Sequence, residues 1–139
     1  MKISIITDSS GLVSLVSTTD NNHAIALRTA DALKNTDGSI IVPSDVFSET
    51  LNVIGRKIGH NIALTIGQEM IDSGVYLVLE ASEKIRRTAL DLFRIQTESV
   101  SFTDCIVMSF ADYFRTKDIF GFDEVFRKNG YTRLGIDRP

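Results

Sequence analysis

The sequence is poor in the residues that build several common kinds of site. Its one cysteine, Cys105, excludes an internal disulfide and is typical of a protein from a reducing compartment. The two histidines, His23 and His60, do not give any usual zinc-ligand spacing with that cysteine. Any metal bound by this chain is therefore expected to have oxygen ligands.

Long apolar runs are missing as well. The longest stretches without a charged residue, 9–19 and 58–68, are far shorter than the about 20 mostly apolar residues of a membrane-spanning helix. Asp8 interrupts the apolar segment after Lys2 before the core of a signal peptide could form. We therefore expect no membrane span and a cytoplasmic protein.

The chain also lacks an excess of positive charge. The chain has 15 basic and 18 acidic residues, a net charge of −3, which argues against a broad basic face for non-specific nucleic-acid binding. Its 139 residues, of which 43% are hydrophobic, suit one globular domain with its own core, and no internal repeat or linker divides them. We predict a single domain over residues 1–139.

Short apolar segments alternate with amphipathic ones along the chain. Strands that are apolar on both faces and alternate with helices indicate a parallel sheet covered on both sides. The prediction is an α/β fold, a three-layer α/β/α sandwich with a central parallel sheet of about five strands. The expected strands are 2–7, 40–42, 75–79, 119–122 and 131–134, and a polar turn is expected at 8–11. Helices are expected after caps at 20–22, from 44, over 61–71, after Ser82, over 103–115 and over 124–128.

Acidic residues occupy positions near the carboxyl ends of these strands, where open parallel sheets bind ligands. Asp8 and Asp123 directly follow strands, Glu49 lies in the helix after the second strand, and Asp104 lies in the first turn of a later helix. Each has a structural explanation too. Asp8 can form a turn, Asp104 can complete a capping box with Ser101, Asp123 can cap a short helix, and Glu49 can be a solvated helix residue. The joint placement is what suggests a site.

A cluster of carboxylates needs a cation. Two carboxylates 4 Å apart repel by about 4 kcal/mol at an effective dielectric constant of about 20. Oxygen ligands of this kind suit Mg²⁺ or Mn²⁺, completed by water and substrate phosphate. Such an ion can lower the pKa of a bound water and orient it toward phosphorus. The predicted reaction class is phosphodiester hydrolysis.

Three segments resemble the PIN-domain nucleases and, within them, the VapC-type toxins of toxin–antitoxin pairs. IITDSSGLVSLV is similar to the family's first strand with its Asp and following Ser/Thr, and DVFSETLNVIGRK to the helix that carries its Glu. FTDCIVMSFADYFRTKDIFGFDEVFRKNGYTRL resembles a Ser/Thr-Asp helix, a strand ending in Phe-Asp, and a Gly-aromatic turn. Gly121 departs from the pattern, because relatives often carry Thr or another small residue there.

The resemblance implies roles for particular residues. It makes Asp8, Glu49, Asp104 and Asp123 the catalytic, metal-binding acids, with the hydroxyls of Ser10 and Thr103 supporting them. It implies an endoribonuclease that depends on Mg²⁺ or Mn²⁺ and hydrolyses RNA with a metal-activated water. A toxin role, a cognate antitoxin and a homodimer are typical of VapC-type relatives. Neither the resemblance nor the pattern assigns the residues that contact RNA.

Two other functions remain open from the residues. One is a catalytically inactive PIN-like module that binds RNA or protein. The other is a phosphatase that uses Asp8 as a nucleophile, which is weakened because Ser10 stands where a second, acidic Asp is expected. Charge does not exclude RNA, because the balance without the four acids is 15 minus 14, or +1.

Overall fold

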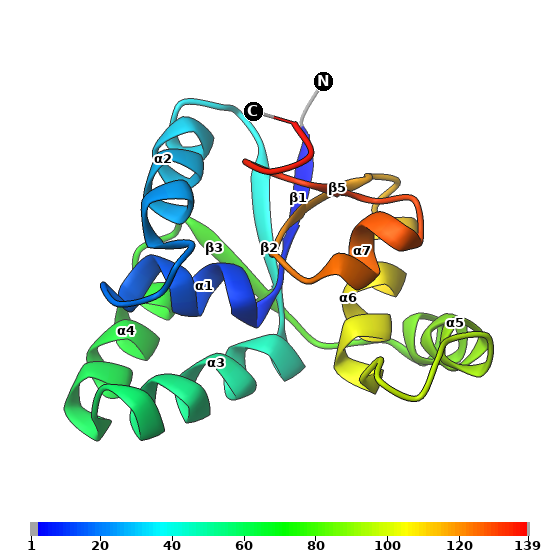
Figure 1. The fold of residues 1–139 in the computed structure, drawn as a ribbon, viewed down its shortest axis with the longest axis horizontal. Coiled ribbons are helices and arrows are strands. Elements are labelled where there is room, and N and C mark those ends of the chain that lie inside the picture. Colours follow the sequence, from blue (N-terminus) through cyan, green and yellow to red (C-terminus); the bar gives the residue numbers. More distant parts are fainter. Residues whose placement is uncertain (1–2, 139) are drawn as a thin grey trace.

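A parallel β-sheet forms the centre of the molecule (Figure 1). The computed structural model describes residues 3–138. Within them, five strands lie in the order β3-β2-β1-β4-β5, and every neighbouring pair is parallel. This confirms the predicted sheet, except that Lys2 of the predicted first strand lies outside the described residues. The strands are β1 (Ser4–Thr7), β2 (Ser39–Pro43), β3 (Tyr76–Leu79), β4 (Asp118–Phe120) and β5 (Thr132–Arg133).

Helices cover both faces of the sheet. The chain runs from β1 through β2 to β3 in one direction and then returns to β4 on the other side of β1. Because crossovers between parallel strands are right-handed, α1 to α4 cover one face and α5 to α7 the other, which gives the predicted three layers (Figure 1). The helices are α1 (Ser9–Val16), α2 (His23–Lys34), α3 (Ser44–Lys57), α4 (His60–Asp72), α5 (Glu83–Arg94), α6 (Phe102–Tyr113) and α7 (Glu124–Lys128). No helix in residues 3–138 has the length and apolar character needed to cross a membrane.

The core is densest where α6 packs against the middle of the sheet. Ile6 of β1 and Ile41 of β2 have almost no exposed surface, and residues 105–111 of α6 are buried in an unbroken run. This run is buried all round because α5 packs against one side of α6 while β1 and β2 contact another. The amino end of α6, with Asp104, is therefore held against a rigid support.

One predicted element is wrong. The polar stretch 8–11 is not a turn but the start of α1, whose first turn is Ser9, Ser10 and Gly11. Asp8 is the N-cap, and its side chain accepts a hydrogen bond from the Ser10 backbone N–H. Gly11 allows α1 to pass close to β4, because a Cβ atom there would meet the Phe120 carbonyl oxygen. A helix starts here because tertiary packing outweighs the turn preference of the serine and glycine residues.

Candidate functional site

Asp8 and Asp123 flank the point where the order of the sheet reverses. Asp8 follows β1, Asp123 follows β4, and the two strands are neighbours although they belong to opposite branches of the topology. In open parallel sheets, this reversal leaves a crevice beyond the carboxyl ends of the strands, where ligands bind. The backbone thus brings residues that are far apart in sequence to one edge of the sheet.

The Asp8 carboxyl is buried and strongly perturbed. Only 4% of the residue is exposed, and its Oδ2 accepts hydrogen bonds from the Ser10 hydroxyl (2.6 Å) and the Ser10 backbone N–H (3.2 Å). The pKa of Asp8 is raised to about 6, mainly because the carboxyl is buried and also because the negative charges of Asp104 and Glu49 lie nearby, although the Ser10 bonds act in the opposite direction. Asp8 is therefore a carboxyl that gains strongly from any cation placed beside it.

Ser10 also ties Asp8 to the loop after β4. Its hydroxyl donates to Asp8 and accepts a hydrogen bond from the Phe122 backbone N–H (2.9 Å). On the other side of the same residue, the Phe122 carbonyl oxygen accepts from Arg133 Nη1 (3.1 Å). The buried Arg133 guanidinium is itself fixed by the Asp137 carboxylate, with bonds of 3.0 Å to each oxygen. Phe122, which precedes Asp123, is thus fixed through both its backbone N–H and its carbonyl oxygen.

Gly121 is explained by its closeness to Asp8. A Cβ atom at this position would lie 2.7 Å from the Asp8 Cβ atom and 3.2 Å from the Phe126 ring. No real pair of side chains approaches so closely, so one of them would have to move. Gly121 therefore leaves room for the Asp8 side chain where it stands.

Asp104 and Asp123 both begin helices. Asp104 forms a capping box with Ser101 at the start of α6, with reciprocal bonds of 3.1 and 3.2 Å. Asp123 caps α7 by accepting from the Val125 backbone N–H (3.0 Å). Burial raises the pKa of Asp104, and the charges of Asp123 and Glu49 raise it further, although its bonds to Ser101 lower it. The structural roles foreseen for both acids are thus present, and their charges still act on the same space.

Glu49 approaches this space from α3. Its carboxylate oxygen Oε2 accepts a hydrogen bond from the Ser9 hydroxyl (3.1 Å), which links α3 to the first turn of α1. Ser9 was not predicted as a site residue. Its position between Asp8 and Ser10 is a sequence signal that could have identified it. Arg133 was missed too, and only its place in the last strand segment distinguished it from other basic residues.

The four acids line a single open cavity. It has a volume of about 450 Å³, and its walls include Asp8, Glu49, Asp104 and Asp123 together with Ser10 and Lys57. Thr103 lines a neighbouring cavity of about 650 Å³, which shares Glu49 with the first. Ser10 lines the acid-lined cavity and bonds Asp8, whereas Thr103 lines only the neighbouring cavity.

The acids face one another without forming a ready ligand set. Within residues 3–138, no three Asp, Glu, His or Cys side chains are close enough to hold one ion together. The carboxylates of Asp104 and Asp123 accept hydrogen bonds from the backbone N–H groups of Ser101 and Val125 at the starts of α6 and α7. The donor set nevertheless consists of carboxylate oxygens around one water-accessible space, which suits a hard divalent ion that keeps some of its water.

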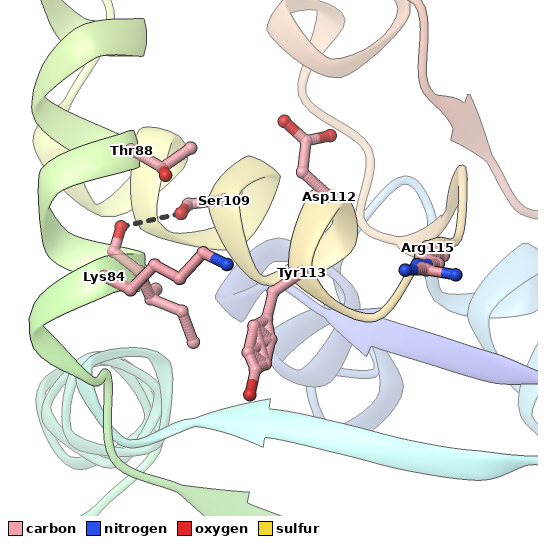
Figure 2. A pocket seen from close by; sticks show the side chains of 7 residues that line it. Lys84, Thr88, Ser109, Asp112, Tyr113 and Arg115 are labelled. Carbon is pink, nitrogen blue, oxygen red and sulfur yellow. Dashed lines mark hydrogen bonds between the residues drawn. The ribbon is translucent and has the colours of Figure 1, made fainter.

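Another cavity, of about 390 Å³, lies between α5 and the C-terminal part of α6 and has no part in this arrangement (Figure 2). Its walls include Lys84, Asp112 and Tyr113, and Ser109 bridges the two helices by donating to the Ile85 carbonyl oxygen (2.6 Å). Figure 2 shows that Asp112 and Tyr113 point to different sides of α6. These side chains do not converge on a common point, so we place the functional site at the acid-lined cavity.

The fold and the acid-lined crevice define an α/β protein with a candidate hydrolytic site at the reversal of its sheet order. The PIN domain family matches residues 5–130, so the chain belongs to this family. Among solved structures, the chain is similar to VapC20 of Mycobacterium tuberculosis, described as a sarcin-ricin loop cleaving toxin. The two chains are 21% identical and superpose with a TM-score of 0.83 over 94% of this chain and 98% of the other. No curated protein matches by sequence.

Proposed function

We propose that the protein is a metal-dependent endoribonuclease of the VapC type. The observation that carries the proposal is the cavity shared by Asp8, Glu49, Asp104 and Asp123, in which the buried Asp8 has its pKa raised to about 6. Membership of the PIN-domain family and the fold shared with a toxin that cleaves the sarcin-ricin loop support it. RNA is accordingly the proposed substrate.

Mg²⁺ or Mn²⁺ is the proposed cofactor, and the residues that would hold it are the four acids of the cavity. A bound ion would supply a water of lowered pKa for attack on phosphorus and would stabilise the charge on the leaving oxygen. The chain's own contribution is positional. Ser10 fixes one oxygen of Asp8, and Gly121 leaves the room that Asp8 occupies. The Ser101 and Val125 backbone N–H groups orient Asp104 and Asp123.

The biological role follows the relatives. We propose that the chain is the toxin of a toxin–antitoxin pair, works in the cytoplasm, forms a homodimer and is held inactive by a cognate antitoxin. The exposed apolar side chains on α4, among them Leu64 and Ile71, offer surface that a protein partner could cover. Size-exclusion chromatography with light scattering tests the homodimer, and a short gene directly upstream that encodes a DNA-binding protein would support the antitoxin.

The test of the nuclease is the Asp8→Asn variant. Asparagine preserves the N-cap of α1 but removes the charge, so RNA cleavage in Mg²⁺ or Mn²⁺ should fall at least about 100-fold while the fold is kept. Asp72→Asn is the matched control, because Asp72 is an exposed acid at the end of α4 and lines none of the cavities described above. Undiminished cleavage by Asp8→Asn would reject the proposal. Metal-dependent RNA binding without cleavage by the unaltered protein would instead favour the inactive binding module.

A further inference from the structure

A second cavity, which we call the amide pocket, opens directly beside the acid-lined one. It has a volume of about 420 Å³ and shares Asp104 and Asp123 with the acid-lined cavity. Its remaining walls come from segment 95–100, which follows α5, and from segment 124–129, which contains α7. A chemical group held in the amide pocket would therefore lie next to a phosphate bound through a metal ion at the acid-lined cavity.

Two amide side chains form the polar wall of this pocket. Gln96 Nε2 donates to Asn129 Oδ1 (3.0 Å), and Asn129 Nδ2 donates back to Gln96 Oε1 (3.1 Å). Asn129 Nδ2 also donates to the Val125 carbonyl oxygen (2.9 Å), which fixes Asn129 at the end of α7. Both side chains are half-buried. The reciprocal pair therefore holds the Gln96 amide plane in a defined orientation before any ligand arrives.

The hydrogen-bonding groups that remain free on this pair define what a ligand can contact. An amide group has two N–H donors and two acceptor lone pairs. Asn129 spends both donors within the protein, whereas Gln96 spends one donor and one lone pair on Asn129. Gln96 thus keeps one N–H donor and one acceptor lone pair, which lie on opposite flanks of its amide because the adjacent pair is used by Asn129, so each can form a single hydrogen bond with a ligand.

The other walls fit a flat, partly apolar ring attached to a phosphate chain. Ile95, Val100 and Val125 supply apolar surface, and the side chain of Ile95 is unusually exposed for its type, at 75%. Lys128 lies on the same wall and is exposed, so its ammonium group can reach a phosphate. The volume falls within the about 300–1,000 Å³ typical of small-ligand sites.

We propose that the amide pocket binds one unpaired nucleobase of the RNA, adjacent to the phosphate that is cleaved. Gln96 hydrogen-bonds the edge of the base, the apolar walls contact its face, and Lys128 contacts the neighbouring phosphate. Proteins that read RNA sequence do so mainly on unpaired bases, whose edges are open. The inference rests on the proposed nuclease function and adds to it the element that selects the nucleotide beside the cut.

Binding of single-stranded RNA to the full chain in EDTA tests this assignment, because it does not require hydrolysis. The probes are fluorescently labelled oligonucleotides of one sequence, each with an abasic nucleotide at a different position, and the readout is fluorescence anisotropy. An abasic nucleotide at one position should weaken binding about tenfold, as expected for the loss of one base contact. Gln96→Met should cause the same loss with intact RNA and no further loss with that abasic RNA.

Two comparisons make the result specific. Gln68→Met alters an exposed glutamine on α4 outside the pocket and should keep the full abasic penalty. Lys128→Met should weaken intact and abasic RNA equally and reduce the salt dependence of binding. If Gln96→Met lowers the Tm, Gln96→Ala is used in its place. Equal binding of intact RNA by wild type and Gln96→Met would overturn the inference, as would a Gln96 effect that adds to the abasic loss.

The outcomes separate this inference from the proposed function. If RNA is never cleaved, but one abasic position and Gln96→Met cause the same, non-additive loss of binding, the amide pocket is a base-binding site and the nuclease proposal fails. If RNA is cleaved in a metal-dependent way but no abasic position matters, the base-binding inference fails alone.

Discussion

At the scale of single residues, the ionised form of Asp8 destabilises the folded protein. Its pKa of about 6, against an ordinary 3.8, means that the folded protein binds the Asp8 proton more tightly than the unfolded chain does. The charged form is therefore destabilising above pH 6, and this cost declines as the pH falls from about 6 to about 4. A buried carboxyl whose pKa is raised in this way is a candidate for binding a cation.

Asp8→Asn should consequently stabilise the protein while it abolishes activity. In EDTA at pH 8, we expect its free energy of unfolding to exceed that of wild type by about 2 to 3 kcal/mol, the equivalent of the raised pKa. The gain should shrink as the pH falls through 6 and be absent below about pH 4. Urea unfolding at several pH values measures it. A gain that stays constant down to pH 4 would show that something other than the Asp8 charge is responsible.

Gly121→Ala should disturb Asp8 without removing any charge. The new Cβ atom would lie 2.7 Å from the Asp8 Cβ atom, which is too close to the main chain for a side-chain rotation to relieve. We expect a loss of about 1 to 3 kcal/mol in stability and a fall in cleavage rate. Gly55→Ala is the control, because its Cβ would meet nothing closer than 3.9 Å and alanine favours the helix. Equal effects of the two variants on cleavage would contradict this explanation of Gly121.

Residue-level reasoning from the sequence proposed the four acids because they lie near the carboxyl ends of the strands, and the structure places all four around one cavity. The family resemblance added Ser10, whose hydroxyl donates to Asp8. It missed Arg133, whose contact with the Phe122 carbonyl oxygen depends on β5 lying beside β4. That pairing is a non-local property, which no local pattern of the sequence contains.

At the scale of elements, local capping chemistry was the most informative signal. Ser82, Ser101 and Asp123 each cap the helix predicted from them, because their side-chain oxygens accept from backbone N–H groups at the helix start. The same chemistry operates at Asp8, but Ser9, Ser10 and Gly11 resemble a turn, so α1 was missed. The boundary of a short helix depends on whether tertiary contacts support it, here the packing of α1 on α2 and α3.

Arg133 of β5 contacts the loop after β4, the helix α7 and the segment after β5, and it should affect the site through these contacts. It donates to the Phe122 carbonyl oxygen and forms ion pairs with Glu124 of α7 and with Asp137. Arg133→Met should release the loop that carries Asp123, so kcat should fall more than KM rises, with a loss of about 1 to 3 kcal/mol in stability. Arg133→Lys should recover part of the kcat, because one donor to the carbonyl oxygen can be kept.

Arg138→Met provides the comparison for this positioning role. Arg138 is exposed and forms an ion pair with the partly buried Asp118 (2.9 Å), so solvent screens the pair in part and its expected contribution is about 1 kcal/mol. Its kcat should match that of wild type. A proportional loss of kcat and stability in both arginine variants would show that Arg133 acts only through general stability.

At the scale of the whole molecule, the sequence predicts the class of fold better than the arrangement of strands. Apolar strands alternating with helices specify a parallel sheet, because both of its faces must be covered. The order β3-β2-β1-β4-β5 is set by non-local pairing, and it is this order that brings β4 next to β1 and Asp123 toward Asp8. The family resemblance made the meeting of the acids an expectation, whereas residue patterns within single segments do not specify which strands become neighbours.

Because the acids come from both ends of the chain, an ion bound between them should stabilise the entire fold. Asp8 and Asp123 lie on different branches of the sheet, and Glu49 adds a third segment from α3. At a free Mg²⁺ or Mn²⁺ concentration of about 100 times Kd, linkage predicts a gain of about 2.7 kcal/mol. For a domain of this size, that corresponds to an increase in Tm of roughly 8 °C. Calorimetry with and without EDTA measures the shift. The increase should be much smaller in Asp8→Asn and in Glu49→Gln, and unchanged in Asp72→Asn. An equal increase in all four proteins would place the stabilising ion away from the acid-lined cavity.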